Sequence, residues 1–148
     1  MEPHAYSVNL TYTAGRRGLL QSDELNTPLE VATPPQFPKG EAGIWSPEHL
    51  FTAAVSSCFM TTFLAIAENS RLEFGAFSCA AQGMLELADG KYRMTEVVLQ
   101  PELELLKEAD QERAVRILQK AEAACLITNS ITAKVSLQPR VSVKQPVA

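Results

Sequence analysis

The residues of this chain best suited to chemistry are its three cysteines, Cys58, Cys79 and Cys125. A thiolate is a nucleophile and a redox centre, whereas a protonated buried thiol is inert. Three cysteines are too few for a disulfide scaffold, and no pair has the spacing of a zinc site. Each cysteine therefore has to be interpreted from its own surroundings in the sequence.

Cys79 has the pattern of an ordinary buried side chain. It lies in an alternating run, on the same side as Phe77, Ala81 and Leu85. Free cysteine is among the residue types most often found buried. We therefore expect Cys79 to be a small hydrophobic residue of a strand.

Cys58 and Cys125 fall on two segments with helical periodicity. The simplest interpretation of Cys58 is a core position, and Cys125 ends a stripe of a second, amphipathic helix. If the two helices pack together, the cysteines could form a disulfide, which needs Cα atoms within roughly 4.4 to 6.8 Å. The two stripes are Leu50, Ala54, Cys58, Thr61 and Ala65, and Ala114, Leu118, Ala121 and Cys125.

A reactive Cys58 needs a cation beside it. It lies about twelve residues into its helix, too deep to benefit from the helix N-terminus. Arg16 and Arg17, in a predicted turn bounded by Gly15 and Gly18, are the candidates. The alternative is a solvated turn with two exposed guanidinium groups.

The element that must position Cys58 is a helix predicted over residues 47–69. Ser46 is a suitable N-cap, Pro47 suits the first helical position, and Glu48 adds a negative charge to the first turn. The charge-free run over residues 50–67 is long enough for a membrane span, but it contains five hydroxyl side chains and no basic residue follows it closely. A helix buried in a core or against a second subunit is the better interpretation.

The other elements give an α+β protein with antiparallel sheets, because strands and helices do not alternate regularly. Asp89-Gly90 is a tight-turn pair at the centre of a predicted hairpin. The expected elements are a half-buried strand over 5–13, a short strand over 29–33, an irregular connection over 33–45, a hairpin over 77–99, a helix over 107–125, and closing strands near 135–137 and 141–143 that Pro139 separates.

Length and charge limit the classes of function. The 148 residues suit a single domain over 1–148, and 46% are hydrophobic. Thirteen basic against seventeen acidic residues give a net charge of −4, which disfavours nucleic acid and membrane surfaces as partners. The N-terminus has no signal-like pattern, so we expect a cytoplasmic protein.

Four segments together resemble the OsmC/Ohr family, over roughly residues 8–138. A Ser-Pro-Glu motif stands ten residues before a helical Cys-Phe, and a second cysteine precedes a Thr-Asn-Ser segment. The segments are YTAGRRG (12–18), WSPEHLF (45–51), AAVSSCF (53–59) and AEAACLITNS (121–130).

The resemblance implies an OsmC-like fold in an intertwined homodimer and a thiol-dependent peroxidase of small organic hydroperoxides. By position, Cys58 would be the peroxidatic cysteine and Cys125 the resolving one. Arg16, or Arg17 as the alternative, would be the site cation, and Glu48 its partner carboxylate. The resemblance implies no bound cofactor and no metal. It implies an external dithiol as reductant, for which dihydrolipoamide on a lipoylated protein is a candidate.

An apolar wall would favour organic hydroperoxides over hydrogen peroxide. Leu50, Phe51, Phe59 and Phe63 are the candidates for it, and they are equally candidates for the core.

The spacing of Glu48 and Cys58 has a consequence for assembly. Ten residues of straight helix correspond to about 15 Å along the axis, too far for both residues to share a site within one chain. We therefore expect Glu48 to come from the other subunit. The chain also departs from the family, because Leu126 stands where many members have a proline after the second cysteine.

Two other readings remain open. The first is a related fold that serves as a redox sensor or binds a small apolar ligand without turnover. The second is a metal site built from Cys58, Cys125, His4 and His49, for which no ligand pair has a recognised spacing.

Overall fold

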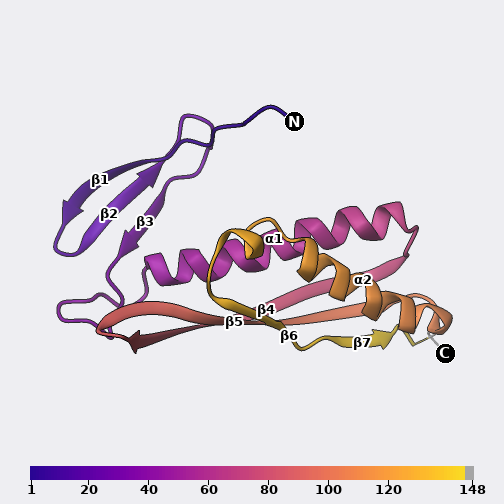
Figure 1. Ribbon diagram of the computed structural model, residues 1–148. Coiled ribbons are helices and arrows are strands. Elements are labelled where there is room, and N and C mark those ends of the chain that lie inside the picture. Colours follow the sequence, from indigo (N-terminus) through magenta and orange to yellow (C-terminus); the bar gives the residue numbers. More distant parts are fainter. Residues whose placement is uncertain (146–148) are drawn as a thin grey trace. The chain divides into compact units, whose positions relative to one another are not determined.

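The computed structural model describes residues 1–145, and the chain divides into two units, Met1–Leu50 and Phe51–Ala148 (Figure 1). The long helix α1, Pro47–Asn69, begins at the end of the first unit and continues in the second. Its bounds are those predicted from the sequence. The helix carries Glu48 and Cys58 without a break, so the axial separation expected between them stands.

The first unit contains a three-stranded antiparallel sheet in the order β1-β2-β3. Ala14 pairs with Arg17, so only Gly15 and Arg16 form the turn between β1 and β2. Gly15 has a φ of 57°, which glycine adopts without steric cost. The predicted four-residue turn is therefore shorter, and Arg17 and Gly18 open a strand that the sequence pattern did not reveal. The strands are β1 Asn9–Ala14, β2 Arg17–Gln21 and β3 Leu29–Ala32.

The first strand was expected to be half-buried, and this is wrong for the chain as described. All six residues of β1 are exposed, including Leu10 at 64% and Tyr12 at 71%. The strand also begins at Asn9, later than predicted. Alternating apolar side chains imply a face that packs against something, and within residues 1–145 nothing covers this one.

The start of α1 follows the capping prediction. The fully buried hydroxyl of Ser46 accepts a hydrogen bond from the His49 backbone N–H at 3.1 Å and bonds the Nδ1 atom of His49 at 2.6 Å. An N-cap side chain satisfies a backbone donor that has no partner within the helix. This cap fixes where the helix begins and therefore the position of every later residue on it.

The buried stripe of α1 is displaced from the one expected through Cys58. Cys58 is half-buried, and Thr61 and Ala65 are exposed. The buried face was predicted wrongly because the helix is apolar on nearly every side, so the sequence does not show which of several stripes faces the core. The buried residues are Val55, Phe59, Phe63 and Ala67.

The second unit has a four-stranded sheet built on the long hairpin of β4, Phe74–Ala88, and β5, Lys91–Leu105. Asp89 and Gly90 both have positive φ, as a two-residue hairpin turn requires. The closing strands β6, Lys134–Leu137, and β7, Arg140–Val143, both pair with β5 in parallel. The expected antiparallel arrangement thus holds for the hairpin and the first sheet, whereas the last two strands make the second sheet mixed.

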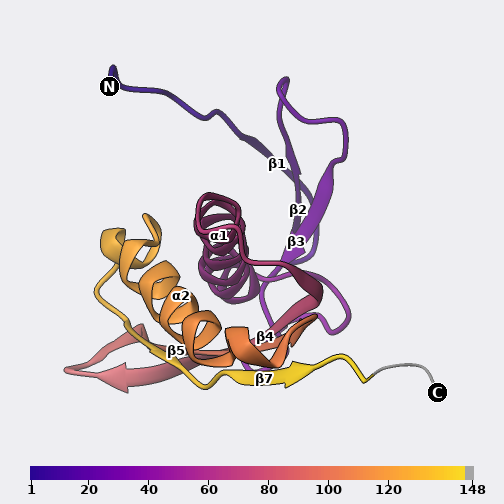
Figure 2. The same ribbon diagram turned by 90° about the vertical axis from the view of Figure 1, so that its right-hand side faces the viewer.

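The two helices of the second unit lie on one face of this sheet (Figures 1 and 2). The second helix, α2, spans Gln111–Ala124, with 3-10 turns at Glu108–Asp110 before it and Thr128–Ser130 after it. Its predicted stripe is confirmed, since Ala114, Leu118, Ala121 and Cys125 are all buried. The core joins this stripe to that of α1 and to Val97, Leu99, Leu103 and Leu105 of β5.

Candidate thiol site

The second unit brings Cys58 and Cys125 together. Cys58 lies in the middle of α1, and Cys125 is the residue that caps the C-terminus of α2. Both cysteines are free, and their side chains lie close enough for each to shift the pKa of the other. Two residues 67 positions apart in the sequence therefore form one site because α1 and α2 are buried against the same core.

The surroundings of Cys58 favour its thiolate. Burial alone would raise its pKa, but hydrogen bonds from the Cys125 thiol, the Ile127 N–H, the Thr62 hydroxyl and the Leu126 N–H outweigh burial and lower the pKa below the ordinary value for cysteine. The Thr62 hydroxyl oxygen lies 3.9 Å from the Cys58 sulfur. The sequence suggested that a cation was needed, yet these neutral donors lower the pKa of Cys58 from within the second unit.

Cys125 has the opposite character. Burial, followed by its hydrogen bond to Cys58, raises its pKa, so it remains a thiol that donates its proton to its neighbour. Thr128 acts in the opposite sense through its hydroxyl and its N–H, which both lower the pKa of Cys125. The Thr128 hydroxyl oxygen is buried and, within residues 1–145, has no hydrogen-bond partner of good geometry. It lies close enough to the Cys125 sulfur to affect the pKa of that thiol.

This pair is chemically asymmetric. The thiolate of Cys58 is stabilised and, once formed, can attack an electrophile, whereas Cys125 holds its proton more strongly and lies close to Cys58. A sulfenic acid formed on Cys58 would meet a thiol that can condense with it to a disulfide.

The two arginines occupy different positions in the first unit. Arg17 lies on β2, where its guanidinium donates to Glu41 at 2.6 Å and to Glu30 at 3.3 Å. The bond to Glu41 is the main cause that raises the pKa of Arg17 above its usual value. Arg16 is exposed at the tip of the turn, and in the described part of the chain its guanidinium makes no ion pair.

The same turn borders a hollow of 590 Å³ within the first unit. Arg16 and Arg17 line it together with apolar side chains such as Leu10, Tyr12 and Val31. Glu48, the expected partner carboxylate, lies half-buried in the first turn of α1. In the first unit the carboxylates at salt-bridge distance from Arg17 are those of Glu30 and Glu41.

The residues proposed as an apolar wall divide into two groups. Phe59 and Phe63 have no exposed surface, and the Phe63 ring stacks on Phe77 with centroids 4.8 Å apart. They form the core of the second unit, the alternative that the sequence left open for them. Leu50 and Phe51 are half-buried.

Cys79 lies on β4 and is half-buried against the core, in line with its expected structural role. Its thiol donates to the carbonyl of Ala80 at 3.5 Å, and burial raises its pKa, so it is a poor nucleophile.

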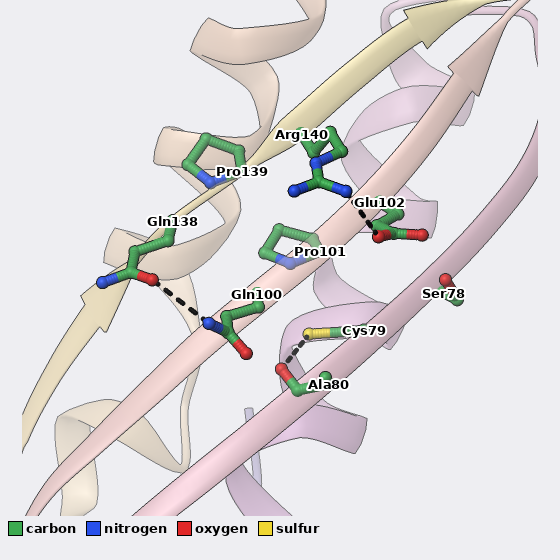
Figure 3. A pocket seen from close by; sticks show the side chains of 9 residues that line it. All are labelled: Ser78, Cys79, Ala80, Gln100, Pro101, Glu102, Gln138, Pro139 and Arg140. Carbon is green, nitrogen blue, oxygen red and sulfur yellow. Dashed lines mark hydrogen bonds and ion pairs between the residues drawn. The ribbon is translucent and has the colours of Figure 1, made fainter.

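Cys79 borders a hollow of 710 Å³ in the second unit, shown in Figure 3, which shares no lining residue with the Cys58–Cys125 pair. The hollow lies where β6 has ended and β7 has not begun, opposite Pro101. Gln100 bonds Gln138 at 3.2 Å across it, and Arg140 pairs with Glu102 at 3.6 Å (Figure 3).

Sequence reasoning missed the donors that surround the two sulfurs. Main-chain N–H groups carry no signal in the residue types, and Thr128 and Thr62 are common polar residues at unremarkable positions. The spacing of Thr62 from Cys58 is the one available clue, since residues four apart are neighbours on a helix.

Comparisons with known proteins agree with this architecture. The OsmC-like protein family matches residues 40–140. The uncharacterized protein YmaD of Bacillus subtilis is 25% identical over 149 residues, which cover 97% of each chain.

Among solved structures, an OsmC-like protein of unknown function from Vibrio cholerae superposes with a TM-score of 0.83 at 23% identity, covering 93% of this chain and 99% of that chain. An organic hydroperoxide resistance protein, OsmC, from Legionella pneumophila gives a TM-score of 0.74 at 25% identity, covering 95% of this chain and 100% of that chain.

Among the described residues, α1 is the one helix long and apolar enough in composition to cross a membrane. Its four fully buried residues belong to the core of the second unit. The family match covers more than two thirds of the sequence and includes Glu48, Cys58 and Cys125. The chain belongs to the OsmC-like protein family.

Proposed function

We propose that this protein is a thiol-dependent peroxidase that reduces organic hydroperoxides to alcohols. The observation that supports this most is the pair formed by Cys58 and Cys125, in which the pKa of the first is lowered and that of the second is raised. Catalytic thiols are found in such surroundings, whereas the one donor to Cys79, the Gln100 N–H, does not offset burial, and its pKa stays raised.

The reaction balances over three steps. The Cys58 thiolate attacks the O–O bond of the hydroperoxide, takes one oxygen as a sulfenic acid and releases the other oxygen as an alcohol after a proton is added. The Cys125 thiol then displaces this hydroxyl as water, leaving a Cys58–Cys125 disulfide. An external dithiol reopens the disulfide by exchange and is itself oxidised. Dihydrolipoamide on a lipoylated protein is the candidate reductant, in the cytoplasm, where thiols are kept reduced.

Arg16 is the better candidate for the site cation. A guanidinium beside the thiolate would hold the peroxide oxygens through its forked donors. Arg17 already has two carboxylate partners, Glu41 and Glu30, whereas the guanidinium of Arg16 is exposed at the turn. Glu48 would orient the guanidinium of Arg16.

The active form in this proposal is a homodimer. The support is apolar surface on two elements, namely β1 with Leu10 and Tyr12, and the uncovered side of α1 with Met60 at 39% and Leu64 at 40% exposure. A second copy of the chain would cover such surface. It would also supply Glu48 to the Cys58 of the first copy, because one helix holds these residues about 15 Å apart.

The test is consumption of cumene hydroperoxide with dihydrolipoamide as reductant, in wild type and three cysteine variants. We expect Cys58→Ser to lose activity, Cys125→Ser to complete one turnover and then overoxidise at Cys58, and Cys79→Ser to match wild type. If the wild type consumes no hydroperoxide, the peroxidase proposal fails and a redox sensor or ligand-binding protein becomes the better reading.

A further inference from the structure

The turn after α2 directs two main-chain donors away from the helix. Cys125 breaks the helix by adopting an extended conformation, with φ −65° and ψ 118°. Its carbonyl accepts the N–H of Asn129 at 3.0 Å, and the Ile127 carbonyl accepts that of Ser130, also at 3.0 Å. These two bonds close the turn, and in residues 1–145 no main-chain carbonyl accepts the N–H of Leu126 or of Ile127.

Both of these N–H groups lie close enough to the Cys58 sulfur to lower its pKa as hydrogen-bond donors. Successive N–H groups that converge on one point form a concave anion site. Such bonds are stronger when the acceptor is charged, so they favour the Cys58 thiolate over the thiol.

Leu126 contributes through its backbone and not through its side chain. The side chain is 66% exposed, whereas the side chain of Ile127 packs against the core and holds the turn in place. A proline at this position would remove this donor, because proline has no backbone N–H.

We propose that the backbone N–H of Leu126, together with that of Ile127, is a catalytic donor that holds the negative charge of Cys58. The donors belong to the segment that carries the resolving cysteine. Disulfide formation removes the negative charge of Cys58, so the hydrogen bonds from this turn stabilise the thiolate and not the disulfide. This inference rests on the proposed function for its catalytic meaning, whereas the contact itself is tested without any hydroperoxide.

The test compares Leu126→Pro, which removes the N–H, with Leu126→Ala, which keeps it. The extended conformation of Cys125 is the one that a residue before proline prefers. The measurement is the rate of Cys58 alkylation by iodoacetamide against pH, with the modified peptide quantified by mass spectrometry.

We expect Leu126→Pro to shift the alkylation midpoint to higher pH and to slow alkylation at neutral pH by about tenfold, the scale of one hydrogen bond to a charged group. Leu126→Ala should match wild type. The inference is overturned if Leu126→Pro matches wild type, or if both variants shift equally.

A second measurement needs no proline variant and decides the matter if Leu126→Pro does not fold. The amide proton resonances of Leu126 and Ile127 should shift with pH in the wild type, with the same midpoint as alkylation of Cys58, and should lose this transition in Cys58→Ser. Amide resonances that do not respond to Cys58 would overturn the inference. Neither experiment involves turnover. Failure of the peroxidase assay would therefore not change the result of either experiment, and the two proposals can be judged separately.

Discussion

At the scale of residues, the chemistry of this protein depends on which hydrogen-bond donors reach each sulfur. Burial raises the pKa of all three cysteines, and only Cys58 receives enough donors to reverse the effect. Residue type alone could not have separated the three, because all the donors to Cys58 except the Thr62 hydroxyl come from backbone groups or from Cys125. The sequence predicted Cys58 and Cys125 as the reactive pair through the resemblance and not through the chemistry of their neighbours.

The lowered pKa of Cys58 predicts how peroxide consumption depends on pH. Deprotonation activates the sulfur, so the rate should rise with pH through the pKa of Cys58 and then level off. The midpoint of this rise should lie below the pKa of free cysteine, which is about 8.5. Cys125→Ala removes one donor, so its single-turnover rate profile should move to higher pH. A profile that is unchanged in this variant would contradict the role given to the Cys125 thiol.

The two arginines of the turn should differ in what they do. Arg16→Ala should lower kcat/KM for cumene hydroperoxide by about a hundredfold or more, as the loss of a group that stabilises a developing charge typically does. Arg17→Ala should change kcat/KM by less than about tenfold, because its guanidinium serves Glu41 and Glu30, and this exposed network contributes little to stability. Steady-state kinetics of both variants checks this, and the reverse ranking would assign the site cation to Arg17.

At the scale of elements, α1 is placed by its cap at Ser46 and by close contact with β4. A Cβ atom added at Gly83 of β4 would overlap the Thr52 hydroxyl oxygen on α1 and approach the Met94 Cε atom to 2.7 Å. The helix carries Cys58, so the small residue on the strand sets how closely the helix with the proposed nucleophile can approach the sheet.

Gly83→Ala should therefore lower the free energy of unfolding by about 1–3 kcal/mol, the usual cost of inserting a methyl group into a filled space. Urea denaturation measures this. Gly75→Ala is the matched control on the same strand, because its added Cβ would meet the Glu104 carboxylate at 2.8 Å, a flexible group that can move away. Equal losses in both variants would show that the contact with α1 is not the cause.

Much of the fold could be predicted because its signals are local. A few neighbouring residues determine where an element begins or ends. Examples are the helix cap at Ser46-Pro47, the turn at Asp89-Gly90 and the strand break at Pro139. The parallel pairing of β6 and β7 with β5 and the buried stripe of α1 could not be predicted, since each depends on distant partners. For the same reason β2, a short strand next to the turn, was missed.

At the scale of the whole molecule, the exposed apolar side chains of β1 and α1 and the position of Glu48 lead to one prediction. If Glu48 serves the Cys58 of the other subunit, co-expression of Cys58→Ser with Glu48→Gln should form heterodimers in which one site has both native residues. Such heterodimers should regain up to about half of the wild-type activity per dimer, whereas each variant alone stays impaired.

Differently tagged copies allow the heterodimer to be purified and assayed against both homodimers. If Glu48 acts within its own chain, the heterodimer has no complete site, and its activity would stay at the level of the impaired homodimers.

In the proposed reaction, Cys58 and Cys125 react with each other after a hydroperoxide oxidises Cys58. Mass spectrometry of the reduced protein after one equivalent of cumene hydroperoxide tests this most directly. We expect the protein to lose two hydrogens and to yield a peptide pair joined through Cys58 and Cys125, with Cys79 still reduced. A protein that stays fully reduced, or a crosslink that involves Cys79, would contradict it.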